Sequence, residues 1–175
     1  MEQIIIVDEN DNCLGVEEKE KCHNGEGILH RAFLAMVFNN EGELLLARRS
    51  KEKRLWPGYW DGTVASHLFE GEDYKGATKR RLLYEIGLAT DQIEYLFKFH
   101  YKIAYEDLGT EHEICAVLKV SGIDSGEINP NPEEISEIRF VDPRILVDRS
   151  HDDKNIHTPW LMLAMQHLRD NTDNA

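Results

Sequence analysis

Residues 66–88 read SHLFEGEDYKGATKRRLLYEIGL, and the fold can be worked out from this stretch. From Asp73 to Ile86 its apolar residues have helical spacing, an acid stands at the start, and Gly87 is placed to cap the end. The pattern predicts one helix over residues 73–86. The small residues Ala65 and Ser66 belong to a predicted loop that leads into it.

Around this helix, apolar runs alternate with turn-forming residues. Two such runs flank NNEG in HRAFLAMVFNNEGELLLARR, residues 30–49, which predicts a β-hairpin. Further elements are predicted on the same grounds: strands within 3–15, 93–105, 111–120 and 137–141, a loop at 129–134, and a last helix from about Pro159. We therefore expect one α/β (α+β) domain over residues 1–175, with an ordered core of about 3–170.

The composition argues against several classes of protein. A formal net charge of -13 over 175 residues is unlike a nucleic-acid-binding protein with a broad basic surface, but it leaves room for a local cationic pocket. No apolar run approaches membrane-spanning length, and the start MEQIIIVDEN lacks the basic region of a targeting segment. Three cysteines without C-x-x-C spacing indicate neither a disulfide framework nor a zinc knuckle. We expect a cytoplasmic protein that binds neither nucleic acid nor membrane.

Five side chains are candidate metal ligands: His23, His30, His67, Glu111 and Glu113. The two glutamates alternate on a predicted strand and so share one face, where they repel each other unless a cation or proton lies between them. Imidazole nitrogen with carboxylate oxygen suits zinc, manganese or magnesium-like ions. The alternative is a solvated strand face with scattered histidines, which the spacing alone favours. The remaining histidines are expected to be structural or surface residues: His100, His112, His151, His157 and His167.

The predicted helix carries a second candidate site. Arg81 and Glu85 are four residues apart on one helix face, and Glu72 stands just ahead of the helix. Such a pair is most often a surface salt bridge. The functional alternative is that Glu72 and Glu85 hold Mg²⁺ while Arg81 contacts a phosphate group, because Mg²⁺ is commonly bound by one or two carboxylates and substrate phosphate oxygens.

The stretch around this helix resembles the Nudix box, G-x5-E-x7-R-E-U-x-E-E-x-G-U, in which U is apolar. The matching positions are Ser66, Glu72, Arg80, Leu82, Glu85, Gly87 and Leu88. Arg81 and Tyr84 occupy two glutamate positions of the box. The resemblance implies a Nudix fold, a mixed β-sheet sandwiched between helices. It also implies that ordinary Nudix hydrolase chemistry lacks two of its acids here.

The closer resemblance is to one branch of that superfamily, the type 1 isopentenyl diphosphate isomerases, and it covers most of the chain. In that branch two histidines, a loop histidine and a Glu-x-Glu pair bind one divalent metal, and all five match the candidate ligands above. The branch's diphosphate contacts match Lys19, Arg49, Lys53 and Arg81. Its glutamate on a diphosphate-bound magnesium matches Glu85.

The chain departs from the isomerases at Ala65, a position that takes part in proton transfer in that branch. The isomerases use a cysteine in a loop of the form S-V-C-G-H, and the loop here is TVASH, with Ala65 in place of the thiol. The opposite proton-transfer group is a metal-bound glutamate, matching Glu113, assisted by a tyrosine, matching Tyr101. A shielding tryptophan of the branch corresponds to Phe140 in EIRFVD. A methyl group cannot transfer a proton, and neighbouring Ser66 is a poor substitute without an activating base.

A metal and diphosphate site without that thiol leaves three functions open. The favoured one is an isomerase-like Nudix hydrolase acting on an organic, isoprenoid-type diphosphate, with Mg²⁺ and a second divalent ion, Zn²⁺ or Mn²⁺, as cofactors. The alternatives are a divergent isomerase and a non-catalytic diphosphate-binding protein. Cys115 follows Glu113 on the same strand face, and a buried core role is expected for it. The partner is expected to be a small molecule, and the protein a monomer or homodimer.

Overall fold

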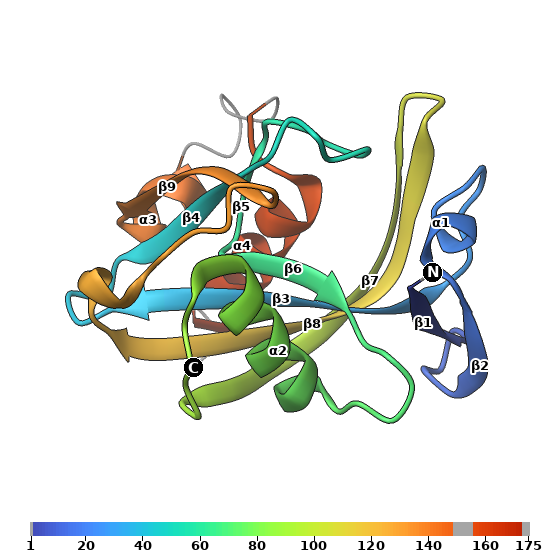
Figure 1. Cartoon of the computed structure of the whole chain (residues 1–175), viewed down its shortest axis with the longest axis horizontal. Coiled ribbons are helices and arrows are strands. Elements are labelled where there is room, and N and C mark those ends of the chain that lie inside the picture. Colours follow the sequence, from blue (N-terminus) through green and yellow to red (C-terminus); the bar gives the residue numbers. More distant parts are fainter. Residues whose placement is uncertain (1, 149–155, 173–175) are drawn as a thin grey trace.

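The computed structural model describes residues 2–148 and 156–172, and a mixed β-sheet crossed by helices on both faces forms its body (Figure 1). The elements follow the chain as β1 Gln3–Val7, β2 Cys13–Glu18, α1 Lys19–Cys22, β3 His30–Asn39, β4 Leu44–Arg49, β5 Trp60–Asp61, β6 Val64–His67, α2 Tyr74–Ile86, β7 Ile93–Tyr105, β8 Gly109–Ile123, a 3-10 turn Ser125–Glu127, β9 Ile135–Val141, α3 Pro143–Asp148 and α4 Pro159–Thr172. Strand β3 is the hub of the sheet, because it pairs with β1, β4, β6 and β8.

Strand β3 is buried on both faces, and its two sets of side chains enter two different cores. Phe33, Ala35 and Val37 pack on the side of α2, which contributes Leu82 and Ile86. Their neighbours in sequence, including Leu34 and Met36, pack on the side of α4. In Figure 1, α2 lies in front of the sheet and α4 behind it. The predicted fold class, a mixed sheet between helices, is confirmed.

Helix α2 has the ends that its sequence predicts. The Asp73 side chain accepts a hydrogen bond from the Gly76 amide at 2.7 Å, a standard N-cap contact. Gly87 ends the helix in the left-handed region, with φ of 68°, where a residue with a Cβ is disfavoured. The helix is therefore fixed in length and in position relative to β6, which precedes it.

The predicted hairpin of residues 30–49 is correct at its turn and wrong along its length. Strands β3 and β4 pair only at Phe38 and Leu44, and beyond this point β3 joins β6 and β8 while β4 joins β5 and β9. Thr63 stands where they separate: its hydroxyl accepts from the Val37 amide at 2.9 Å and donates to the Leu45 carbonyl at 2.7 Å. The side chain replaces ladder bonds that the parted strands cannot make.

The segment that was predicted as a loop of small residues is strand β6. Ala65 pairs with Leu34 of β3, and His67 pairs with Ala32. Small, non-alternating residues give no strand signal in sequence, so only pairing with a neighbour reveals it. Within the described residues, no helix is long and apolar enough to cross a membrane.

Thr63→Val should destabilise the fold, because the Val37 amide and Leu45 carbonyl would lose a buried partner at nearly unchanged side-chain volume. We expect a loss of about 1–3 kcal/mol in the free energy of unfolding, measured by urea denaturation. Thr78→Val is the matched control, since the buried Thr78 hydroxyl has no hydrogen-bond partner among the described residues. Equal effects of the two changes would contradict the assigned role of Thr63.

Candidate functional site

Strand register brings the candidate metal ligands together. His30 of β3 pairs with Glu113 of β8, and on the other side Ala32 of β3 pairs with His67 of β6. These three ligands therefore lie side by side on the α4 face, and Glu111 precedes Glu113 by two residues on that same face. His23 follows α1 and completes a group of five whose donor atoms all lie within 4.8 Å of one another.

Two of the histidine rings are oriented by backbone carbonyl groups. The Nδ1 atom of His23 lies 2.6 Å from the Lys19 carbonyl oxygen, and that of His30 lies 2.7 Å from the Ile28 carbonyl oxygen. Donation from each Nδ1–H leaves Nε2 as a lone-pair donor that faces the cluster, which is the arrangement typical of metal-bound histidine.

Burial and charge in this cluster favour a bound cation. The Nε2 atom of His23 lies 2.9 Å from Glu111 Oε2, and the buried Nε2 atom of His30 lies 3.4 Å from Glu113 Oε1, so imidazole nitrogens and carboxylate oxygens face one another. Burial, together with the neighbouring imidazoles, lowers the pKa of His67 well below its usual value, so this ring is neutral at pH 7. Burial opposes ionisation of Glu113, but hydrogen bonding and charge from His30 outweigh it, and the pKa of Glu113 is lowered. Burial lowers the pKa of His23, but the adjacent Glu111 outweighs burial and raises it, so without a cation a proton on His23 offsets this carboxylate. Binding of a divalent ion displaces such a proton.

Glu113 also has a buried tyrosine partner. The Tyr101 hydroxyl donates to Glu113 Oε2 at 2.6 Å, while Glu113 Oε1 lies 3.2 Å from His67 Nε2. Burial and the adjacent Glu113 charge raise the pKa of Tyr101 well above its usual value, so the phenol keeps its proton. Tyr101 stacks in turn on the Trp160 ring at a centroid distance of 6.2 Å. One glutamate oxygen is thus fixed by Tyr101, and the other faces the histidines.

A cavity of about 420 Å³ opens onto this cluster. Its lining includes four of the five candidate ligands and the residues expected to bind diphosphate: Lys19, Arg49, Lys53 and Arg81. Ala65, Ser66 and Cys115 also line it. Lys19 lies at the rim, where it pairs with Glu2 at 2.9 Å with both side chains partly exposed. Four of the five candidate metal ligands and the cations expected to bind diphosphate therefore line one cavity.

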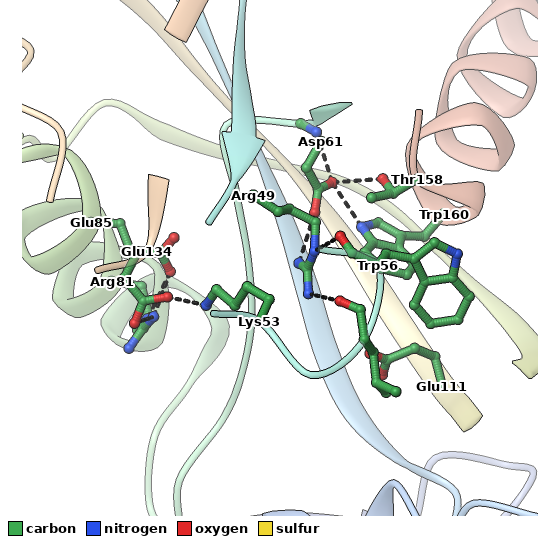
Figure 2. Close-up of polar contacts among 12 residues, drawn as sticks. Arg49, Lys53, Trp56, Asp61, Arg81, Glu85, Glu111, Glu134, Thr158 and Trp160 are labelled. Carbon is green, nitrogen blue, oxygen red and sulfur yellow. Dashed lines mark hydrogen bonds and ion pairs between the residues drawn. The ribbon is translucent and has the colours of Figure 1, made fainter. Parts of the chain in front are cut away.

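Arg49 is held by a network that no sequence pattern predicted (Figure 2). Its guanidinium donates to the carbonyl groups of Leu55 at 2.9 Å and Trp56 at 3.1 Å, and lies 3.3 Å from Asp61 Oδ2. Asp61 is buried, and its other oxygen accepts from the Trp160 indole at 2.8 Å. One carboxylate thus positions both an arginine and an aromatic ring of the cavity.

The remaining two cations are joined through a glutamate that sequence reasoning missed. Glu134 accepts from Lys53 and lies 3.1 Å from Arg81 Nη2, which also bonds Glu85 at 2.7 Å (Figure 2). Glu85 and Glu134 line a smaller cavity that shares Arg49 and Lys53 with the large one. Glu134 comes from the loop NPNPEE, and neither spacing nor periodicity marks it there.

Comparison with known proteins places this site in a family. The NUDIX domain family matches residues 28–162, which is most of the chain.

The chain belongs to the Nudix family.

The relatives define the branch more closely. An isopentenyl-diphosphate Delta-isomerase of Haloarcula marismortui is 38% identical over 169 residues, covering 94% of this chain and 90% of the relative. An isopentenyl-diphosphate Delta-isomerase 1 of Photorhabdus laumondii is 35% identical over 161 residues, covering 91% and 90%. Among solved structures, DR0079 of Deinococcus radiodurans superposes with a TM-score of 0.77 at 22% identity, covering 95% of this chain and 98% of that one. At that identity the superposition supports the Nudix fold alone.

The two carboxylates that were expected at a magnesium ion, Glu72 and Glu85, do not line the large cavity. Glu72, expected at a magnesium ion, instead binds Arg80 at 2.6 and 2.8 Å, and Arg80 donates to the His67 carbonyl at 3.2 Å. This Nudix-box pair therefore supports the backbone of His67. Glu85 lies with Arg81 and Glu134, apart from the five-residue cluster.

The expectation for Phe140 is also corrected. Phe140 pairs with Leu45 in the β4–β9 ladder, and its half-buried side chain packs against the core under α2. The aromatic residues that line the cavity are Phe33, Tyr101 and Trp160, and Trp160 comes from the first turn of α4. The prediction was wrong because it assigned the shielding aromatic ring to a residue of strand β9, whereas the last helix places Trp160 at the cavity. The TPW start of that helix was the available signal.

The other histidines lie apart from the cluster, as expected, wherever the structure describes them. His100 and His112 stack on each other at 5.3 Å, His167 packs near Phe97 and Phe99, and His157 is buried beside Trp60. His151 lies outside the described residues.

Gly109→Ala should weaken metal binding without touching a ligand side chain. A Cβ at Gly109 would lie 2.5 Å from the His23 carbonyl oxygen, which the Thr110 amide also binds at 3.0 Å, so the His23 backbone must move. We expect a loss of about tenfold or more in affinity for Zn²⁺ or Mn²⁺, measured by calorimetry, because displaced ligands and their supports typically cost that much. Gly126→Ala is the control, since its added Cβ makes only an ordinary 3.5 Å contact with Asp124. Unchanged affinity in Gly109→Ala would show that His23 is not a ligand.

Proposed function

We propose that this Nudix protein is a divalent-metal-dependent hydrolase of a small organic diphosphate, of isoprenoid type. The observation that carries the proposal is the shared cavity. Four members of the five-residue His/Glu cluster line it together with Lys19, Arg49, Lys53 and Arg81, while Ala65 stands where the isomerase branch has its thiol. Binding groups for a diphosphate and a metal are present. The proton-transfer pair of an isomerase is incomplete.

The cationic side chains suit a diphosphate. Five N–H groups on each guanidinium exceed the bonds that Arg49 and Arg81 make inside the chain, so both retain donors for phosphate oxygens. Lys53 adds an ammonium group on the same wall. These side chains gather cationic groups around one cavity of a chain whose formal net charge is -13.

The organic part of the substrate would face an apolar wall. Leu55, Ala65, Tyr101, Cys115 and Trp160 line the cavity on this side. Aromatic and aliphatic surfaces bind a branched hydrocarbon by burial, and the polar groups of Tyr101 and Trp160 already bond Glu113 and Asp61. The lining therefore favours a prenyl group.

Glu113 is the group best placed to accept a proton from an attacking water. Tyr101 fixes one of its oxygens, and the other faces the cluster, so the carboxylate is oriented and ionised. A bound divalent ion supplies Lewis-acid chemistry and offsets phosphate charge. Water attacks phosphorus, the bridging P–O bond breaks, the leaving phosphate takes the electron pair, and Glu113 takes the water's proton.

Isomerisation is the second candidate, and a specific observation favours it: the relatives that match over nearly the whole chain are named as isomerases. Allylic isomerisation needs one group to add a proton and another, on the opposite face, to remove one. Glu113 offers one such group. Ala65 offers none, and burial raises the pKa of Cys115 well above its usual value, so that thiol is a poor proton source or base. Binding without chemistry is the third candidate.

Phosphorus NMR separates the candidates. With Mg²⁺ present, wild-type protein should release phosphate and a prenyl monophosphate from isopentenyl or dimethylallyl diphosphate. Nucleoside diphosphates should react more slowly, because the Tyr101 hydroxyl and the Trp160 indole already bond Glu113 and Asp61. Interconversion of the two prenyl diphosphates with no phosphate release would contradict hydrolysis and establish the isomerase. Binding with no product in either assay would leave the non-catalytic candidate.

Ala65→Cys should add isomerase chemistry. The thiol would stand on β6 two residues from His67, facing the same cavity as Glu113. We expect allylic hydrogen exchange, measured by proton NMR in heavy water, to appear in the variant and to be weak or absent in wild type. The gain is limited, since a positioning error near 1 Å can cost about a hundredfold in rate. Strong exchange in wild type would show that another group does the work of the thiol.

A further inference from the structure

Lys53 and Arg81, which line the large cavity, are ion-paired with Glu134 and Glu85, which line the adjoining smaller cavity. Arg81 bonds Glu85 through Nε at 2.9 Å and through Nη2 at 2.7 Å, and its Nη2 also lies 3.1 Å from Glu134 Oε1. The second oxygen of Glu134 binds the ammonium group of Lys53. Two positive and two negative side chains therefore form one chain of ion pairs, Glu85, Arg81, Glu134 and Lys53 (Figure 2).

Glu134 is fixed in this position by its backbone. Its carbonyl oxygen accepts from the Ser50 amide at 2.9 Å, and its amide donates to the Asn131 carbonyl at 3.0 Å. Ser50 also accepts from the Lys53 amide at 3.2 Å, so the loop of Glu134 and the turn of Lys53 are one hydrogen-bonded unit. Asn131 is anchored to α2 through the Glu85 carbonyl at 2.8 Å. These bonds fix the backbone of Glu134 beside the turn of Lys53 and the end of α2, and its carboxylate contacts both Lys53 and Arg81.

This placement has a consequence for a diphosphate. Side chains that are mostly buried, 14% exposed for Glu134 and 12% for Arg81, interact through a medium that screens charge less than water does. An anion that approaches Arg81 and Lys53 meets a carboxylate between them, and the four side chains sum to no net charge. Attraction by the two cations is largely cancelled unless another positive charge arrives with the ligand.

We infer that Glu134 makes diphosphate binding dependent on a divalent cation: it neutralises Lys53 and Arg81 against metal-free anions and, beside Glu85, offers a second carboxylate to the cation that a diphosphate brings. The inference rests on the proposed function and deepens it, because it states which form of the diphosphate this site binds. Mg²⁺ binds readily to one or two carboxylates together with phosphate oxygens, which is the set of donors assembled here. Metal-free diphosphates and other free anions are thereby discriminated against.

The alternative is that Glu134 only holds its loop. In that case its removal would weaken the site equally with and without metal, since the cations would be misplaced in both conditions. The ratio of the two affinities distinguishes the roles, whereas activity alone does not.

The experiment is calorimetric titration with inorganic pyrophosphate, in EDTA and in excess Mg²⁺, of wild type, Glu134→Gln and Glu133→Gln. The glutamine at 134 is close to isosteric, and the backbone bonds of residue 134 do not depend on its side chain. Glu133→Gln makes the same charge change at the adjacent position, which is exposed. Among the described residues, the Glu133 side chain accepts a hydrogen bond only from the Tyr84 hydroxyl, at 3.4 Å.

Wild type and Glu133→Gln should bind pyrophosphate at least about tenfold more tightly in Mg²⁺ than in EDTA. In EDTA, Glu134→Gln should bind pyrophosphate about tenfold more tightly than wild type, because one negative charge is removed from a poorly screened site. Most of the difference between its affinities in Mg²⁺ and EDTA should therefore disappear. The inference is overturned if Glu134→Gln keeps the wild-type ratio of affinities in Mg²⁺ and EDTA. It is also overturned if wild type binds pyrophosphate equally well in both buffers. Neither result contradicts the proposed function. No binding of pyrophosphate to wild type in either buffer overturns both.

Discussion

The site depends on the register of β3 between β6 and β8. His30 opposite Glu113, and Ala32 opposite His67, bring ligands from three strands to one point on the α4 face of the sheet. Side chains alternate along a strand, so a slip of one residue would send His30 to the α2 face and its apolar neighbours to the wrong core. Because β3 is buried on both faces, the two cores fix the register and the register assembles the ligands.

Two carboxylates outside the five-residue His/Glu cluster, Asp61 and Glu134, then position the rest of the cavity. Asp61 holds Arg49 at 3.3 Å and the Trp160 indole at 2.8 Å, joining the polar and aromatic walls through one buried group. Burial raises the pKa of Asp61, while Arg49 and three hydrogen bonds oppose the rise. Glu134 joins Lys53 to Arg81 in the same way. The positive charges of this Nudix chain are therefore held in place by acids, which reconciles an anion site with a net charge of -13.

Much of this could be predicted from the sequence where a pattern is local or a motif is in register. The helix from Asp73 to Gly87 has both caps in its sequence, and the Glu-x-Glu pair has the period of a strand. The features that were missed depend on tertiary partners. Strand β6 exists because β3 pairs with it, the separation of β3 from β4 depends on Thr63, and Glu134 acquires its role only when its loop folds against α2. Phe140 was misassigned because the sequence does not reveal that the first turn of α4 reaches the cavity.

The central claim is that one cavity holds a metal in the His/Glu cluster and a diphosphate at the neighbouring cations. Anomalous diffraction from a crystal grown with Mn²⁺ and a non-hydrolysable prenyl diphosphate analogue tests it most directly. The account predicts an anomalous peak within bonding distance of His23, His30, His67, Glu111 and Glu113, with the analogue's phosphates against Arg49, Lys53 and Arg81. An ordered cluster without a peak, or an analogue bound elsewhere, would contradict it.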